Sequence, residues 1–143
     1  MMRPRKSIYR SNEGFSLIEL MIVILITGVL AAVAVAVYNK NIENAKRAEA
    51  VAGIGSIRKS LIISYGIEGH FPIQDGFSKV VGKDWNDIKD GELTGTYFKD
   101  KHYKYRSYDG IEYRIKCQKA GLLEKNVWID ETGHWRFNVE DDE

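Results

Sequence analysis

The feature that most constrains this chain is an apolar run near its start. From Leu20 to Val37 there are eighteen residues, and only Thr27 and Gly28 among them are not plainly apolar. A helix of that length can cross a lipid bilayer. The run has no polar stripe, so it does not fit one side of a soluble core helix. We therefore predict a membrane-spanning helix.

A carboxylate and a basic segment precede this run. A charge at the centre of a membrane helix costs roughly 2.5–3.5 kcal/mol on insertion scales, so Glu19 is expected to have a partner. The first fourteen residues carry four basic side chains against Glu13 alone. A basic start before an apolar run is typical of a secretory signal, but the small residue Gly14 lies before the run rather than after it. A cut after Gly14 would keep the apolar helix and create a new α-amine on Phe15.

The new amine and the carboxylate would lie four residues apart, on one helix face. Within one helix they need not touch. Between neighbouring helices staggered by a turn, Glu19 of one chain would meet the Phe15 amine of the next, and the pairing would offset the cost of burying both charges.

The motif Gly14-Phe15-Ser16-Leu17-Ile18-Glu19-Leu20 resembles the prepilin signal of type IV pilins and the related pseudopilins. The resemblance implies that a prepilin peptidase cuts between Gly14 and Phe15 and methylates the Phe15 amine. It also implies that Glu19 pairs with a neighbouring subunit's amine during assembly. Ala36 stands where many members of the family have a proline, so we expect a more continuous helix here.

Two simpler interpretations of this region remain open. Glu19 is then an accidental charge whose side chain reaches the lipid headgroups, or the run is a signal anchor that is never cleaved.

Together the residues and the resemblance divide the chain into five predicted segments: a leader at 1–14, a membrane or filament-core helix at 15–38, an amphipathic half of the same helix at 39–68, a connecting loop at 69–101 and a β-sheet head at 102–143.

The second half of the predicted helix is polar with an apolar stripe. Its steps are close to the helical period, and its members are Ile42, Ala45, Ala48, Ala52, Ile57, Leu61 and Tyr65. Gly66, Gly69 and Pro72 are expected to end the helix. The stripe needs a cover.

The C-terminal part of the chain is predicted to form a sheet that packs against this apolar stripe. We expect strands at 102–107 and 111–117 around an Asp-Gly turn, and a second hairpin at 127–130 and 135–139. Apolar and polar residues alternate along them, as in half-buried antiparallel strands. The predicted fold is α+β and pilin-like, with the long helix packed on a four-stranded antiparallel sheet. Tyr97, Tyr103, Tyr105, Tyr108 and Tyr113 are expected to fill a sheet face or to form an exposed sticky surface.

Composition limits the possible functions. The formal net charge is +1, and it becomes −2 once the leader is removed. This near-balance argues against a strongly basic nucleic-acid-binding surface, and no nucleic-acid site can be recognised. The one cysteine, Cys117, cannot form a disulfide within the chain, and we expect it to be a buried small hydrophobe.

We predict no catalytic residues, no metal site and no cofactor. His70, His102 and His134 are scattered and have no zinc-ligand spacing with Cys117. No phosphate loop or nucleophile elbow is present, so an enzyme is not expected. Four acidic residues close together in sequence are candidate calcium ligands: Asp84, Asp87, Asp90 and Glu92. Their spacing does not match the calcium-loop pattern, so a solvated acidic loop is favoured.

The resemblance leads to a functional prediction. The chain is expected to be the structural subunit of a type IV pilus or pilus-like filament, serving motility, adhesion or DNA uptake. Its partners would be further copies of itself, prepilin peptidase, the membrane and the inner-membrane assembly machinery. It would wait in the inner membrane and then reach the cell surface in the pilus. Two alternatives stay open: a periplasmic type II secretion pseudopilin and a membrane-anchored binding module.

Overall fold

The computed structural model describes residues 14–123 and 125–138. The chain consists of two compact units, Met1–Asn39 and Lys40–Glu143. One long helix, α1 (Leu17–Glu68), contributes to both units. The α+β class predicted from the sequence is confirmed, since α1 is followed by an antiparallel sheet.

In the first unit, α1 is apolar on every side and every described residue is exposed. Ile24 and Leu30, for example, are 61% and 63% exposed. The apolar window has a mean hydropathy of 3.0 and none of it is buried, so this helix is long and apolar enough to cross a membrane. The helix runs without a break through Ala36, as its lack of proline predicts.

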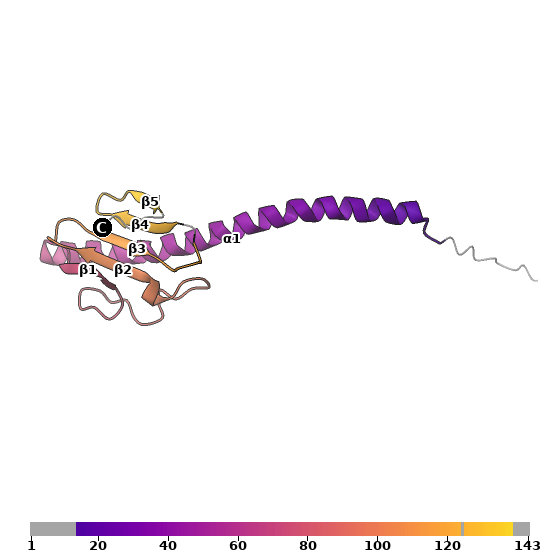
Figure 1. Ribbon diagram of the computed structural model, residues 1–143. Coiled ribbons are helices and arrows are strands. Elements are labelled where there is room, and N and C mark those ends of the chain that lie inside the picture. Colours follow the sequence, from indigo (N-terminus) through magenta and orange to yellow (C-terminus); the bar gives the residue numbers. More distant parts are fainter. Residues whose placement is uncertain (1–13, 124, 139–143) are drawn as a thin grey trace, which may run out of the picture. The chain divides into compact units, whose positions relative to one another are not determined.

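In the second unit, a five-stranded sheet lies against the end of α1 (Figure 1). The strands follow one another in chain order, each antiparallel to the next. They are β1 (Gln74–Lys79), β2 (Tyr103–Ser107), β3 (Arg114–Cys117), β4 (Asn126–Asp130) and β5 (Trp135–Asn138), with a 3-10 helix η1 (Asp100–His102) before β2.

The core lies between the sheet and the second half of α1. Alternate residues of the three central strands, together with Tyr113 just before β3, belong to this buried core: Tyr103, Tyr105, Tyr113, Ile115, Cys117, Val127 and Ile129. Three of the tyrosines considered above thus fill the inner sheet face, while Tyr108 is 60% exposed. Burial of apolar surface of this kind is the main force holding the head together.

The helix stripe predicted from the sequence was wrong in its first half and at its last member, Tyr65, which is 45% exposed. Ile57 and Leu61 are buried as predicted, but the other fully buried apolar positions are Ala50 and Ile54. The predicted alanines Ala45, Ala48 and Ala52 are exposed instead. Alanines carry too little apolar area to decide which helix face is buried, so the larger Ile54 sets the face.

The strand β1 was not predicted, and the sheet has five strands rather than four. Its sequence, Gln74-Asp-Gly-Phe-Ser-Lys79, lacks the alternation of a half-buried strand. Its register with β2 is also irregular between Gln74 and Ser78. Such a bulged edge strand gives almost no periodic signal. The segment predicted as a connecting loop therefore begins with a strand.

The strand β3 is shorter than predicted because Asp109 organises the chain before it. The Asp109 Oδ1 atom accepts hydrogen bonds from the backbone N–H groups of Ile111 and Glu112, both 2.9 Å long. This turn keeps the two residues out of the sheet. At the other end, residue 139 of the last predicted strand lies outside the described residues.

Candidate processing and assembly site

The predicted cleavage site lies just before the start of α1. Gly14, Phe15 and Ser16 precede the helix, and Phe15 is 86% exposed. A Cβ atom added at Gly14 would meet nothing within 4 Å. This chain therefore does not itself require a glycine at Gly14, and a need for glycine has to come from whatever acts on this bond.

Glu19 lies in the first turn of α1 and caps its start. Its Oε2 atom accepts a hydrogen bond from the Ser16 backbone N–H at 2.9 Å. The first N–H groups of a helix have no partner within the helix, and a glutamate three residues on can satisfy one of them. The positive end of the helix dipole also favours a carboxylate here. Sequence analysis missed this local role, although the Ser-x-x-Glu spacing signals it.

Glu19 has no cationic partner within the described part of the chain. Its Oε2 atom binds Ser16, and none of the ion pairs found there includes its carboxylate. Its other carboxylate oxygen therefore has no partner among the described residues, and Glu19 lies at the exposed start of an apolar helix. If the helix surface is buried in a membrane or a filament, an unpaired carboxylate there is costly. Pairing of Glu19 with a cation from another molecule then becomes strongly favourable.

The polar residues inside the apolar run do not interrupt it. The Thr27 hydroxyl donates to the backbone carbonyl oxygens of Val23 and Ile24, at 2.8 and 3.1 Å. A hydroxyl satisfied in this way carries no unmet polar group into an apolar setting. Gly28 has open space where a Cβ would lie, so it offers a neighbouring helix a close approach.

In the head, the connecting segment is fastened to α1 by Glu49. The Glu49 carboxylate accepts hydrogen bonds from the backbone N–H groups of Thr96, Tyr97 and Phe98, at distances from 2.7 to 3.2 Å. Hydrogen bonds to a charged acceptor are among the strongest in proteins. Nothing in the local sequence around Glu49 indicates this role, because its partners lie about 48 residues away.

A second carboxylate, Asp100, shapes the same segment. It accepts hydrogen bonds from the backbone N–H groups of Gly91 and Leu93 and from the Thr94 hydroxyl. Burial alone would raise the pKa of Asp100, but the bonds from Gly91, Thr94 and Leu93 outweigh it and lower the pKa. These two carboxylates give the connecting segment a fixed shape.

The residues considered for metal binding or catalysis lie apart. Within residues 14–123 and 125–138, no three histidine, cysteine or acidic side chains gather around a common point. Cys117 is fully buried, and this burial raises the pKa of its thiol to about 12. A thiol of that kind packs as a small hydrophobe. Asp84, Asp87 and Asp90 are exposed on the loop that precedes η1.

Comparison with known proteins adds two findings. Residues 9–35 match a family model described as the prokaryotic N-terminal methylation motif. The chain is 39% identical over 89 residues to the fimbrial protein of Dichelobacter nodosus, a match that covers 60% of this chain and 55% of that relative. It is 38% identical over 118 residues to the type IV major pilin protein PilE1 of Neisseria gonorrhoeae, covering 78% and 67%. The chain thus spans about half the length of the first relative and two thirds of the second.

Proposed function

Because this chain belongs to the type IV pilin family, we propose that it is the structural subunit of a type IV pilus. The observation that carries the proposal is the first half of α1, which is apolar all round and exposed on every side. A monomer in water cannot keep such a surface uncovered. A membrane before assembly and a bundle of like helices after it both remove the surface from water.

The N-terminal residues supply the processing step of this proposal. Prepilin peptidase would hydrolyse the bond between Gly14 and Phe15 and then methylate the new Phe15 amine. Phe15 is exposed and lies outside the helix, so the bond is accessible without unwinding α1. The basic leader would remain behind, and the apolar helix would stay with the mature chain.

Glu19 would supply the register of the filament. After cleavage the Phe15 amine of one subunit is a cation, and the carboxylate of Glu19 in the next is an anion. In an apolar bundle the attraction between the two is far stronger than in water. A subunit placed one turn out of step would bury both charges unpaired, which costs several kcal/mol by desolvation.

The two alternatives are less well supported. The two curated relatives carry pilus and fimbrial names, and neither is named as a secretion pseudopilin. An anchored binding module would not need both a helix that is apolar on all sides and a carboxylate in the first turn of that helix. The family is structural, and the inner membrane followed by the cell surface is the proposed route of the protein.

The variant Glu19→Gln separates the two roles of this side chain. Glutamine keeps an oxygen that accepts the Ser16 N–H bond, so α1 remains capped, but it has no charge to pair with an amine. We expect the Glu19→Gln chain to be cleaved and held in the membrane at wild-type levels while surface filaments fall at least tenfold. Immunoblots of sheared and membrane fractions measure both.

A matched control tests whether loss of the cap matters. Glu19→Ala removes the cap and the charge together, and it should assemble no better than Glu19→Gln. Normal filament yield from cleaved Glu19→Gln subunits would refute the role of charge in setting the register.

A further inference from the structure

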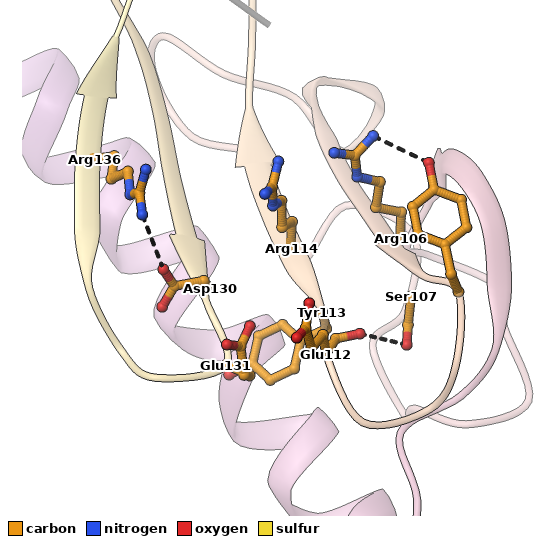
Figure 2. A pocket seen from close by; sticks show the side chains of 9 residues that line it. Arg106, Ser107, Glu112, Tyr113, Arg114, Asp130, Glu131 and Arg136 are labelled. Atoms are coloured by element: carbon orange, nitrogen blue, oxygen red, sulfur yellow. Dashed lines mark hydrogen bonds and ion pairs between the residues drawn. The ribbon is translucent and has the colours of Figure 1, made fainter. Parts of the chain in front are cut away.

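A charged hollow of about 410 Å³ opens in the head beside the turns that join β2 to β3 and β4 to β5 (Figure 2). Its volume falls within the range of about 300–1,000 Å³ that is usual for small-ligand sites. Six charged side chains line it: Arg106, Arg114, Arg136, Glu112, Asp130 and Glu131. Three are basic and three are acidic, so the hollow has almost no net charge.

The opposite charges occupy different parts of the hollow. Figure 2 shows the three arginines side by side across the strands, with Glu112 and Glu131 toward the turns. The strand register places Arg114 in the middle, because it pairs with Arg106 on one side and with Asp130 on the other. Glu112 is two residues before Arg114, so their Cα atoms are at most about 7 Å apart.

The two glutamates do not pair with the two arginines nearest to them. Among the described residues, no carboxylate lies within 4 Å of the Arg106 or Arg114 guanidinium. Over the same residues, the Glu112 and Glu131 carboxylates accept no hydrogen bond, although the Glu112 backbone makes two. Cations and anions thus lie close to one another across a gap that is too wide for a direct ion pair.

Aromatic rings hold the two arginines in place. Arg106 lies over the Phe77 ring, at 4.5 Å from its centroid, and donates a hydrogen bond to the Tyr108 hydroxyl at 3.2 Å. Arg114 lies over the Trp128 ring at 5.2 Å. Stacking fixes a guanidinium and leaves the N–H groups at its edge available to an anion. Preorganised groups lose little entropy when a ligand binds.

The third acidic residue, Asp130, is occupied by its own turn. Its Oδ1 atom accepts bonds from the Thr132 N–H and hydroxyl and from the His134 N–H. Its Oδ2 atom lies 4.0 Å from Arg136, at the limit of an ion pair. Arg136 and Asp130 therefore largely balance each other, and the groups left for a ligand are Arg106, Arg114 and the two glutamates.

We propose that this hollow binds a free, zwitterionic α-amino acid. The ligand carboxylate would accept hydrogen bonds from Arg106 and Arg114, and its ammonium group would donate to Glu112 and Glu131. A simple anion would be attracted by the arginines but repelled by the glutamates, and a simple cation would meet the reverse. A ligand that carries both charges on neighbouring atoms satisfies both sets of groups.

The test is an NMR titration of the full, isotope-labelled chain in neutral detergent micelles, with glycine as the probe. We expect saturable shifts of the Arg106 and Arg114 side-chain N–H signals and a millimolar dissociation constant, since so small a ligand gains limited affinity. Acetate lacks the ammonium group and methylammonium lacks the carboxylate, so each should bind at least tenfold more weakly. Glycine betaine keeps both charges but has no N–H donor, and it should also bind more weakly than glycine.

Variants of the two sets of groups should have effects of opposite sign. Arg114→Gln should weaken glycine binding at least tenfold and strengthen methylammonium binding, because a repulsive charge is removed. Glu112→Gln and Glu131→Gln should each weaken glycine binding and strengthen acetate binding. A variant that merely failed to fold would weaken the binding of every probe.

Lys59→Gln and Asp87→Asn are the matched controls. They remove one charge of either sign from exposed positions outside the hollow and should leave the glycine dissociation constant unchanged.

Four results would overturn the proposal. They are the absence of saturable shifts with glycine, acetate binding as tight as glycine binding, methylammonium binding as tight as glycine binding, and an equal loss of affinity in Lys59→Gln. Tight acetate binding would make the hollow a site for simple anions, and tight methylammonium binding a site for simple cations. The titration uses unassembled chains, so its outcome does not depend on whether the chain forms pili.

Discussion

At the scale of single residues, Gly53 shows how closely α1 and the sheet fit. A Cβ atom at this position would overlap the ring of Tyr103, which is 1% exposed and whose hydroxyl donates to the Glu49 carbonyl oxygen at 3.4 Å. Only glycine leaves room for this ring against the helix backbone. The sequence reveals two nearby glycines in α1 but not which of them is in contact.

Alanine at these two glycines should have opposite effects. Gly53→Ala forces the buried Tyr103 ring to move, and overpacking of this kind costs about 1–3 kcal/mol. Gly55 has open space around it, so Gly55→Ala should stabilise the helix by up to about 1 kcal/mol. Thermal melting of the full chain in detergent should therefore show a lower Tm for the first variant and a higher Tm for the second. A Tm increase in both would contradict the contact.

Buried protons make the head sensitive to alkali. Burial raises the pKa of Cys117 from 9.0 to about 12 and that of Tyr105 from 10.0 to about 12. The unfolded chain releases these protons first, so stability is complete below about pH 9 and falls as the pH rises toward 12. Each group adds a slope of about 1.4 kcal/mol per pH unit.

The variant Cys117→Ala isolates the thiol from the tyrosines. Urea unfolding between pH 8 and 11 should show the wild type losing stability from about pH 9. In Cys117→Ala the loss should begin about one unit higher, where tyrosine ionises. Coincident pH profiles for the two proteins would show that the thiol ionises freely in the folded head.

At the scale of elements, Glu49 ties the connecting segment to α1. Three consecutive backbone N–H groups bind the Glu49 carboxylate. The neighbouring Gly95 lies so close to this carboxylate that a Cβ atom would overlap it. Periodicity predicted α1 and most of the strands because their residues alternate or repeat. It could not predict this anchor or β1, since both depend on contacts distant in sequence.

Glu49→Gln should loosen this segment without unfolding the head. The amide replaces one acceptor oxygen with a donor, which would face an N–H group, and loses the charge that strengthens the remaining bonds. We expect hydrogen exchange at Thr96, Tyr97 and Phe98 to speed up at least tenfold. Glu68→Gln makes the same change at an exposed site of α1. It should alter hydrogen exchange at Thr96, Tyr97 and Phe98 little. Equal protection in both variants would rule out the anchor.

At the scale of the whole molecule, the two units differ in whether their apolar residues are buried or exposed. The head buries its apolar residues between sheet and helix, while the first half of α1 exposes its own. The sequence alone predicted the apolar helix, the motif from Gly14 to Glu19 and the α+β class, because all three are local patterns. The pairing of Arg106 with Arg114 and of Lys104 with Lys116 escaped prediction, since it arises only from the register between β2 and β3.

The most direct test of the proposed role is the intact mass and N-terminal sequence of the protein sheared from cells. The account predicts a chain that begins at N-methylated Phe15, has lost residues 1–14 and is recovered in the sheared filament fraction. A chain that still begins at Met1 or Met2, in cells with an active prepilin peptidase, would contradict it.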